Sequence, residues 1–526
     1  MRLQADFSCG VLVVGTGLAG IRSAIAAAKT GQPVILCSAG KLFSGSSFYP
    51  GTWGLGLIGP DGEGDEADLV DSILTLGAGM ADQRIVRSFV RGINPAIEEL
   101  KAMGVRLKAA ENKDQKDFIP CFDRKHRNWN GILFDSAREV FSRQLKELGV
   151  QVMERTEVLK LTKNGGRVDG AVIAMDGGIH WVRAGAVVLC SGGLGGLYSY
   201  RLTTDDVHST GHALALEAGA ALKNLEFMQI MPGFVSPCPK TIFNEKTFRY
   251  LRMEGVPMDQ DLLELRSTHG PFTSRLADRA VDFAILRHQG EEGVLCRYDP
   301  SLQKNTPEFI TTYFDWLRST HGLTMADPFR IALYAHAANG GIVIDEHGFT
   351  GVPGLYAAGE ITGGMHGADR IGGLSTANGL VFGARAGKAA AEDIHMTVRN
   401  AVDYAPEYLP DGAGKQKALR GLMTRHGLVD RNEAGLQTAI DILNSIRSLP
   451  TAPDGVSWAE LVRSQRVQHQ ITLARCVLTA QLLRRESRGS HFRSDYPARD
   501  DALASSIRIT ADYHTIHATF EIKEEK

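Results

Sequence analysis

The sequence of 526 residues contains no apolar run long enough to cross a lipid bilayer, which takes about 18 or more consecutive apolar residues. Its first residues pass from a short apolar run directly into a glycine turn, without the apolar region and cleavage site of a signal peptide. It also lacks an excess of charge, because 58 basic residues face 60 acidic ones. We therefore expect a cytoplasmic protein that neither spans a membrane nor binds nucleic acid as its main activity.

Paired cysteines are absent as well. The seven cysteines are dispersed and none forms a Cys-x-x-Cys pair, so we expect no iron–sulfur cluster, no other metal site and no disulfide framework within this chain. Hydrophobic content of 43% and charged content of 22% are typical of a soluble globular protein, and the length favours two to four domains. Glycine is abundant, with 58 residues, which indicates many tight turns or a backbone that approaches a ligand closely.

The first glycine cluster follows the apolar run at residues 11–14 and has the pattern G-x-G-x-x-G, formed by Gly15, Gly17 and Gly20. An alanine-rich segment and a second apolar run, "PVILC", come next. Strand, glycine loop, helix and strand in this order predict a dinucleotide-binding unit, whose helix N-terminus holds a pyrophosphate. Ser38 ends the second strand, where an acidic ribose ligand is most common; a serine hydroxyl can still bind a ribose, which favours FAD over NAD.

Later segments repeat the pattern of a strand that ends in glycines. "VRAGAVVLCSGGLGG" does so at Gly192 and Gly193, and the helix predicted after Ser375 begins beside the glycine-rich stretch "AAGEITGGMHGADRIGG". Charge and irregular apolar spacing set residues 222–333 apart, and helical periodicity dominates after residue 401. We expect an FAD-binding domain at 1–221 and 334–400, an inserted capping domain at 222–333, and a C-terminal helical domain at 401–526.

Several of these motifs, in this order, resemble the flavoprotein family of fumarate reductases, succinate dehydrogenases and L-aspartate oxidases. The similarity covers "STGHALALEAGA", "LEFMQIMPG", "AHAANGGIVID", "GVPGLYAAGEITGGMHGADRIGGLS" and "RRESRGSHFRSDYP". It implies an α/β fold, with a Rossmann-like FAD-binding domain, an inserted α+β capping domain and a C-terminal helical domain. Together with the glycine motifs it implies that FAD is bound by Gly15, Gly17, Ala19, Gly20, Ser38, Ser46, Ser47, Val158, Gly192, Gly193, Glu360 and Ser375.

The resemblance also implies catalytic roles for three side chains. Arg370 would bind a substrate carboxylate, His336 would bind the other end of the substrate, and Arg275 would donate or accept a proton. Arg279 is the alternative to Arg275, because the two arginines are one residue closer together than is usual in the family. The implied reaction is hydride transfer between the N5 atom of the flavin and a carbon of a carboxylate-activated bond, under a capping domain that excludes water.

Three positions depart from the family pattern. Ser46 and Ser47 stand where the membrane-bound members carry the histidine that attaches FAD covalently, so we expect FAD to be bound non-covalently. Met231 replaces a histidine that helps to bind a dicarboxylate, which favours a monocarboxylate or a larger enoate as substrate. His212 replaces an aspartate near the cofactor, where it could change the flavin potential or be a tolerated substitution.

Two alternative functions remain open from the sequence. One is an L-aspartate oxidase or a similar amino-acid oxidase, which non-covalent FAD favours. The other is a flavoprotein subunit that relays electrons to an iron–sulfur protein, since this chain has no cysteine pattern for a cluster of its own. The late cluster of Arg488, His491 and Arg493 is expected to tie the C-terminal domain to the FAD domain rather than to take part in catalysis.

Overall fold

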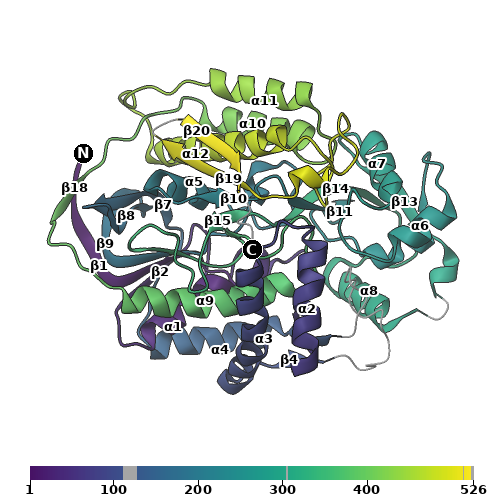
Figure 1. The fold of residues 1–526 in the computed structure, drawn as a ribbon, viewed down its shortest axis with the longest axis horizontal. Coiled ribbons are helices and arrows are strands. Elements are labelled where there is room, and N and C mark those ends of the chain that lie inside the picture. The colour runs from purple at the N-terminus through teal and green to yellow at the C-terminus, as the bar shows by residue number, and fades with distance from the viewer. Residues whose placement is uncertain (110–126, 304–305, 513–514, 523–526) are drawn as a thin grey trace.

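The computed structural model of the protein describes residues 1–109, 127–303, 306–512 and 515–522. Within them, the largest sheet has eight strands, in the order β6-β2-β1-β9-β8-β7 with β16 beside β9 and β18 beside β1, and it lies in the half of the molecule that contains the N-terminus (Figure 1). Strands β6, β2, β1, β9 and β16 run parallel to one another. The bounds are β1 (Arg2–Val14), β2 (Val34–Cys37), β6 (Gln151–Met153), β7 (Glu157–Asn164), β8 (Arg167–Met175), β9 (Gly178–Leu189), β16 (Leu355–Ala357) and β18 (Ala401–Asp403).

The predicted dinucleotide-binding unit is confirmed at the start of the chain. The last residues of β1 are fully buried, as expected of a parallel strand covered on both faces, and helix α1 (Leu18–Ala28) follows the glycine turn directly. Strand β2 then returns to the same sheet beside β1. The predicted α/β fold class is confirmed with it.

Helices α1, α4 (Phe134–Glu147) and α9 (Leu374–Glu392) lie on one face of this sheet, and α3 (Gln83–Met103) packs against α9 (Figure 1). Helices α1 and α9 pack directly against each other. A Cβ at Gly387 of α9 would overlap the backbone of Ser23 in α1, so the small residues of α9 are required for this close approach. The small-residue helix predicted after Ser375 is therefore α9.

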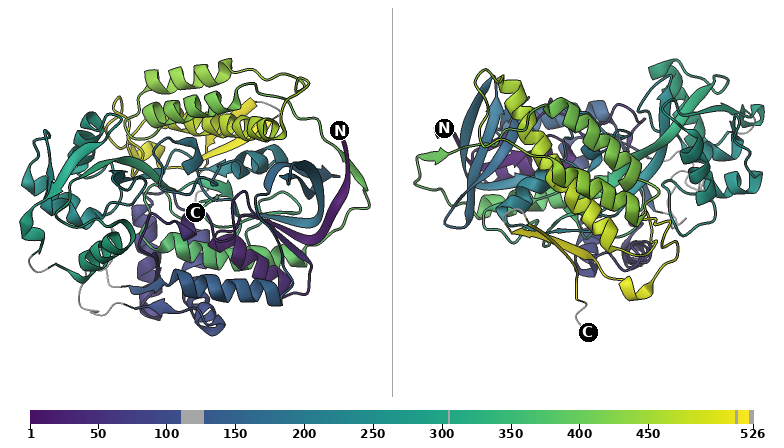
Figure 2. Two further views of the ribbon diagram at one scale, coloured as in Figure 1. Left: turned by 180° about the vertical axis from the view of Figure 1, so that it is seen from behind. Right: turned by 90° about the horizontal axis from the view of Figure 1, so that it is seen from above.

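The capping region lies at the end of the molecule opposite the N-terminus in both views of Figure 2. It contains a four-stranded antiparallel sheet, β11-β14-β13-β12. Its elements are β11 (Met228–Ser236), β12 (Leu251–Met253), α6 (Gln260–Arg266), α7 (Arg279–His288), β13 (Val294–Tyr298), α8 (Glu308–His321) and β14 (Phe329–Ala338). The boundary expected between residues 333 and 334 lies inside β14, because this strand continues to Ala338 to pair with β11.

The C-terminal part combines helices with a β-hairpin. Helices α10 (Gly412–Gly427), α11 (Glu433–Ser445) and α12 (Trp458–Leu483) pack together, and strands β19 (Ile507–Asp512) and β20 (Thr515–Phe520) follow them. Strand β19 pairs with β10 (Leu222–Lys223), which extends a five-stranded sheet, β17-β15-β10-β19-β20, in which β15 is Gly341–Val343 and β17 is Thr362–Gly363. Helices alone were expected after residue 401, although Ile507 and Ile509 show the period of two that is typical of a half-buried strand.

A small antiparallel sheet has three strands in the order β3-β5-β4. It is formed by β3 (Leu55–Gly59), β4 (Leu107–Lys108) and β5 (Asn128–Ile132). Across the described ranges, no helix combines the length and apolarity needed to span a bilayer. The cysteines in the described part of the chain are free thiols, and no cluster of ligand-type side chains there could hold a metal ion.

Candidate active site

The glycine turn between β1 and α1 brings the backbone close to the neighbouring strand. Gly15 has φ +114°, and a Cβ at this position would overlap the carbonyl of Cys190. A Cβ at Gly20 would overlap the carbonyl of Gly15. Gly17 has an ordinary φ of −70°, and its missing side chain leaves room facing Ser47 Oγ, which an added Cβ would approach to 3.6 Å. The turn therefore keeps the N-terminus of α1 open to a ligand.

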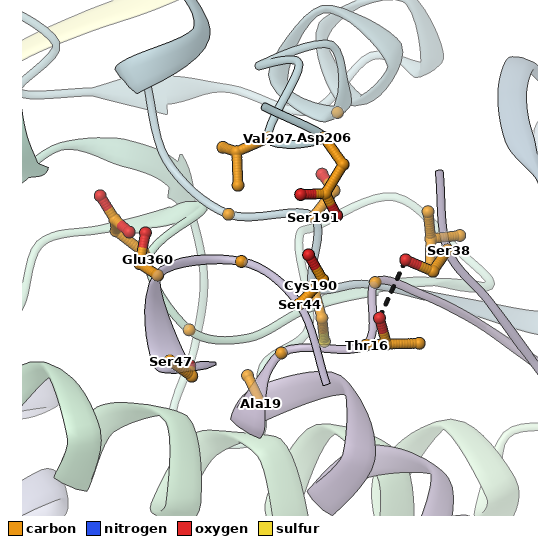
Figure 3. A pocket seen from close by; sticks show the side chains of 18 of the residues that line it. Thr16, Ala19, Ser38, Ser44, Ser47, Cys190, Ser191, Asp206, Val207 and Glu360 are labelled. Atoms are coloured by element: carbon orange, nitrogen blue, oxygen red, sulfur yellow. Dashed lines mark hydrogen bonds between the residues drawn. The ribbon is translucent and has the colours of Figure 1, made fainter. Parts of the chain in front are cut away.

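A cavity of about 150 Å³ lies over this turn, and Figure 3 shows side chains that line it. Thr16 Oγ1 donates a hydrogen bond to Ser38 Oγ at 2.9 Å, so the end of β2 offers a hydroxyl pair rather than a carboxylate. All but two of the residues expected to bind FAD line this cavity: Gly15, Gly17, Ala19, Ser38, Ser46, Ser47, Val158, Gly192, Glu360 and Ser375. The other two, Gly20 and Gly193, do not line it but permit close packing behind its wall. A side chain at Gly193, for example, would occupy the space that the Glu360 carboxylate fills.

The residues around this cavity fit the FAD that the sequence predicts. The Oγ of Ser191 is buried at its edge without a hydrogen-bond partner among the described residues, as expected of a hydroxyl that a ligand satisfies. Glu360 lies opposite, where its Oε1 accepts a hydrogen bond from the Ala338 N–H at 2.9 Å. Burial raises the pKa of Glu360.

Ser46 and Ser47 lie at the point where the cavity passes over the start of α1. Ser47 Oγ accepts a hydrogen bond from the N–H of Leu18 at 3.2 Å, and Ser46 Oγ lies 2.9 Å from Thr203 Oγ1. Both hydroxyls are therefore held by the protein, and neither is a nucleophile of the kind that a histidine would provide.

A second cavity, of about 330 Å³, adjoins the first and shares five wall residues with it: Ser46, Leu55, Glu360, Ser375 and Thr376. Its other walls come from the small β3-β5-β4 sheet, from β11 and β14 of the capping region, and from the loop before α9. Two of the predicted catalytic residues, His336 and Arg370, line it. The structure thus brings these two together beside the dinucleotide cavity, although 34 residues separate them in sequence.

Arg370 is buried and held in one orientation. Its Nε donates to Gln229 Oε1 at 2.7 Å, and Gln229 Nε2 donates back to the Arg370 carbonyl at 3.1 Å. Its Nη2 lies 3.3 Å from His336 Nε2, which must accept because a guanidinium can only donate. Burial and this guanidinium lower the pKa of His336 to about 3, so the ring is neutral and carries its proton on Nδ1.

The two candidate proton-transfer arginines lie outside the described lining of this cavity. The Arg275 side chain is 44% exposed, and its Nε is 3.7 Å from Asp369 Oδ2. Asp369 directly precedes Arg370 in the sequence. Arg279 instead donates to the carbonyl of Ser274 and stacks at 5.8 Å over the ring of Phe492. Of the two, Arg275 therefore lies against the loop that carries Arg370.

Sequence reasoning missed two buried polar residues beside Arg370 and a third on the wall of the second cavity. Gln229 stands in the quoted motif "EFMQIMPG", two residues before Met231. Asp369 accepts a hydrogen bond from Thr273 Oγ1 at 2.8 Å, and burial raises its pKa to about 7. Glu245 lines the second cavity, and burial raises its pKa to about 6. The available signal at Gln229 was a polar residue among the apolar residues of that motif.

Met231 and His212, the other two departures from the family pattern, have different surroundings. Met231 lines the second cavity and is only 8% exposed. His212 lies in α5 (Gly211–Ala218), fully buried and outside the described lining of both cavities. Burial lowers the pKa of His212 to about 3, so this ring is neutral at physiological pH.

The C-terminal arginine cluster lies behind the loop that carries Arg370. Arg488 pairs with Glu486 at 2.8 Å, and Arg493 pairs with Asp495 at 2.7 Å. Ser490 donates through both its N–H and its Oγ to the carbonyl of Ala368, at 3.1 Å in each case. These contacts fix the C-terminal segment against the FAD domain, which supports the structural role expected for this cluster.

Comparison with known proteins gives consistent matches along the chain. Residues 10–256 and 306–376 match the family model described as FAD binding domain, and residues 416–524 match that described as fumarate reductase flavoprotein C-term. The chain is 30% identical to an L-aspartate oxidase of Mycobacterium leprae, over 97% of each chain. It is 26% identical to a CoM/CoB fumarate reductase subunit of Methanothermobacter marburgensis, over 96% of this chain and 97% of the relative. A solved quinol-fumarate reductase structure has the same fold, with a TM-score of 0.79 and 22% identity over 99% of each chain.

Proposed function

This chain belongs to the FAD-dependent flavoprotein family of fumarate reductases, succinate dehydrogenases and L-aspartate oxidases, and on that premise we propose that its second cavity binds a carboxylic acid for reduction or dehydrogenation. The reaction class we propose is hydride transfer at a carbon–carbon bond next to a carboxylate. The observation that carries the proposal is the pairing of buried Arg370 with neutral His336 in a cavity that adjoins the FAD site.

Arg370 is suited to bind and orient the carboxylate. It keeps its charge at every physiological pH, and its contacts with Gln229 and His336 hold the planar guanidinium at the cavity wall, where its charge and geometry suit a carboxylate. Burial strengthens this attraction, because little water competes for the charge. His336 contributes a neutral ring whose Nδ1 has no hydrogen-bond partner among the described residues, and which can donate to a second substrate oxygen.

FAD, when bound in the first cavity, supplies the hydride transfer through its N5 atom. The residues of this chain bind the acid and transfer the proton. Arg370 and His336 stabilise negative charge that develops on the carboxylate-activated carbon chain. Arg275 is proposed to transfer the proton at the other carbon, and movement of the capping region toward the cavity would bring it into reach while excluding water.

We propose that FAD is held without a covalent bond. The glycine turn and the N-terminus of α1 would bind the pyrophosphate, Thr16 and Ser38 a ribose, and Glu360 the ribityl chain. Ser46 and Ser47 offer only hydroxyls at the position of covalent attachment.

The test is anaerobic photoreduction of the flavin in the purified protein, followed by its reoxidation with fumarate, monocarboxylic enoates, iminoaspartate or oxygen. Rapid reoxidation by one enoate supports the proposal and names its substrate class. If no acid reoxidises the flavin, the proposal is wrong.

Two alternatives are outcomes of the same experiment. An L-aspartate oxidase-like activity is favoured by the 30% identity to enzymes of that name, and it predicts rapid reoxidation by oxygen together with reduction by an amino acid. An electron-relay role is favoured by the similarity to one subunit of a fumarate reductase. It predicts that only a protein partner, such as an iron–sulfur protein, discharges the flavin.

A further inference from the structure

We propose that the acid bound by Arg370 carries a single carboxylate and a bulky apolar group, of the size of an aromatic ring, that packs against Met231. This inference rests on the proposed function, and it names the substrate class of the same cavity. It follows from two features of the cavity: the wall around Met231 is apolar, and the charges of the lining residues disfavour a second carboxylate.

The wall around Met231 is a packed apolar cluster. Met231 on β11 belongs to a buried group with Tyr49, Leu202, Ile242 and Tyr334, against which Trp53 packs. Of these residues, Tyr49, Trp53, Leu202, Met231 and Ile242 line the cavity, and Trp129 of β5 lines it as well. Aromatic rings, a thioether and branched side chains form a surface that favours an apolar group of matching size.

The tyrosine hydroxyls of this cluster are already used. Tyr49 donates its hydroxyl to the carbonyl of Lys240, and Tyr334 donates to the carbonyl of Phe234 at 2.9 Å. Tyr313, which packs in edge contact with Trp53, donates to the carbonyl of Ile242 at 3.0 Å. Tyr49 lines the cavity, and with its donor directed at a backbone carbonyl it presents ring carbon rather than a free donor to a substrate.

The charges in the cavity disfavour a second carboxylate. Besides Arg370, the one other permanent cation among the described lining residues is Lys108, whose side chain is half-buried on the small β4 strand. An ammonium is more strongly hydrated than a guanidinium, so we expect Lys108 to contribute less to binding than buried Arg370. Glu245 and Glu360 also line the cavity, and both repel a second anion when ionised. An apolar group avoids this repulsion and displaces water from the cluster around Met231.

The experiment measures binding and turnover with matched acids. The oxidised holoenzyme is titrated with 3-phenylpropanoate and with succinate, and binding is followed through the change in flavin absorbance. Reoxidation of the photoreduced holoenzyme is then compared for cinnamate and fumarate. We expect the aromatic monocarboxylate to bind at least about 10-fold more tightly than the dicarboxylate, which corresponds to about 1.4 kcal/mol, and to reoxidise the flavin faster.

Variants at position 231 test the cause of this preference. M231H introduces a donor into the apolar wall, so the preference should move at least about 10-fold toward succinate and fumarate. M231L keeps the wall apolar and should retain the ranking of the acids. Flavin content and melting temperature show whether each variant has folded. If M231H does not fold, the inference is tested by the ranking of the acids in the wild type and in M231L.

Failure of this inference can be told apart from failure of the proposed function. A wild type that prefers succinate and fumarate overturns the apolar substrate class while leaving a carboxylic acid oxidoreductase in place. If an R370Q variant binds both acids as tightly as the wild type, Arg370 does not bind the carboxylate, and the proposed function itself is wrong.

Discussion

Gln229 and Arg370 bind each other twice, through Arg370 Nε to Gln229 Oε1 at 2.7 Å and through Gln229 Nε2 to the Arg370 carbonyl at 3.1 Å. One residue lies on β11 of the capping region, and the other lies on the loop before α9. The pair therefore fixes the guanidinium relative to the strand that carries Met231. We infer that Gln229 is a positioning residue for the carboxylate clamp.

The first prediction concerns this pair. Q229L removes both hydrogen bonds at nearly constant volume, and a hydrogen bond to a charged group contributes about 1.5–3 kcal/mol. We expect the Kd of the acid, measured by flavin absorbance, to rise about 10-fold or more while FAD content stays unchanged. The matched control is Q437L on α11, where the exposed glutamine donates a hydrogen bond to Asp441; this variant should leave the Kd unchanged. An unaltered Kd in Q229L would contradict the positioning role.

The second prediction separates Arg275 from Arg279. R275Q should slow reoxidation of the reduced flavin by the acid at least about 100-fold, because it removes the proposed proton donor, while FAD and the acid still bind. R279Q should retain turnover but lower the melting temperature, because it loses the contact with Phe492 and the hydrogen bond to Ser274. The reverse result, with turnover lost only in a folded R279Q, would assign proton transfer to Arg279.

The third prediction concerns the glycine turn. A Cβ at Gly17 would face the first cavity, and the backbone there suits any residue, so G17A should fold but bind FAD less tightly. FAD titration into the apoprotein measures the affinity, and thermal unfolding of the apoprotein measures the fold. The control is G421A in the exposed interior of α10, where space is open; it should leave FAD affinity unchanged and stabilise the protein by about 0.5–1 kcal/mol. Unchanged FAD affinity in G17A would contradict binding of the pyrophosphate at the glycine turn.

The fourth prediction follows from Ser46 and Ser47. Because only hydroxyls stand at the position of covalent attachment, acid precipitation should leave all of the FAD in the supernatant, measured by its absorbance. Flavin that remains with the precipitated protein would indicate a covalent bond formed by another residue.

The fifth prediction concerns Asp369 and pH. Burial raises the pKa of Asp369 in the folded protein from about 3.8 to about 7, so the folded state binds the proton more tightly than the unfolded state. The resulting stability is fully present below about pH 4 and is lost as the pH rises to about 7, with a slope of at most about 1.4 kcal/mol per pH unit. D369N cannot ionise, and its free energy of unfolding should fall less than that of the wild type between pH 5 and pH 7. Parallel pH profiles for the two proteins would contradict the raised pKa.

The sequence by itself determined the dinucleotide-binding unit. Gly15, Gly17 and Gly20 lie within six residues, between a buried apolar run and an alanine-rich helix, and local backbone rules are enough to predict their geometry. The resemblance added His336 and Arg370, because each lies in a contiguous motif that can be read along the chain. Both residues line the second cavity, which adjoins the FAD site.

The tertiary structure alone decided the surroundings of those residues. Gln229 meets Arg370 across 141 positions of sequence, and β19 pairs with β10 across almost 300 residues of chain. The hydroxyls of Tyr49 and Tyr334 turn toward backbone carbonyls, which makes the wall around Met231 apolar. Local patterns specify turns, helices and strands because these depend on near neighbours, whereas the partners of a buried polar group depend on which distant segments packing brings into contact.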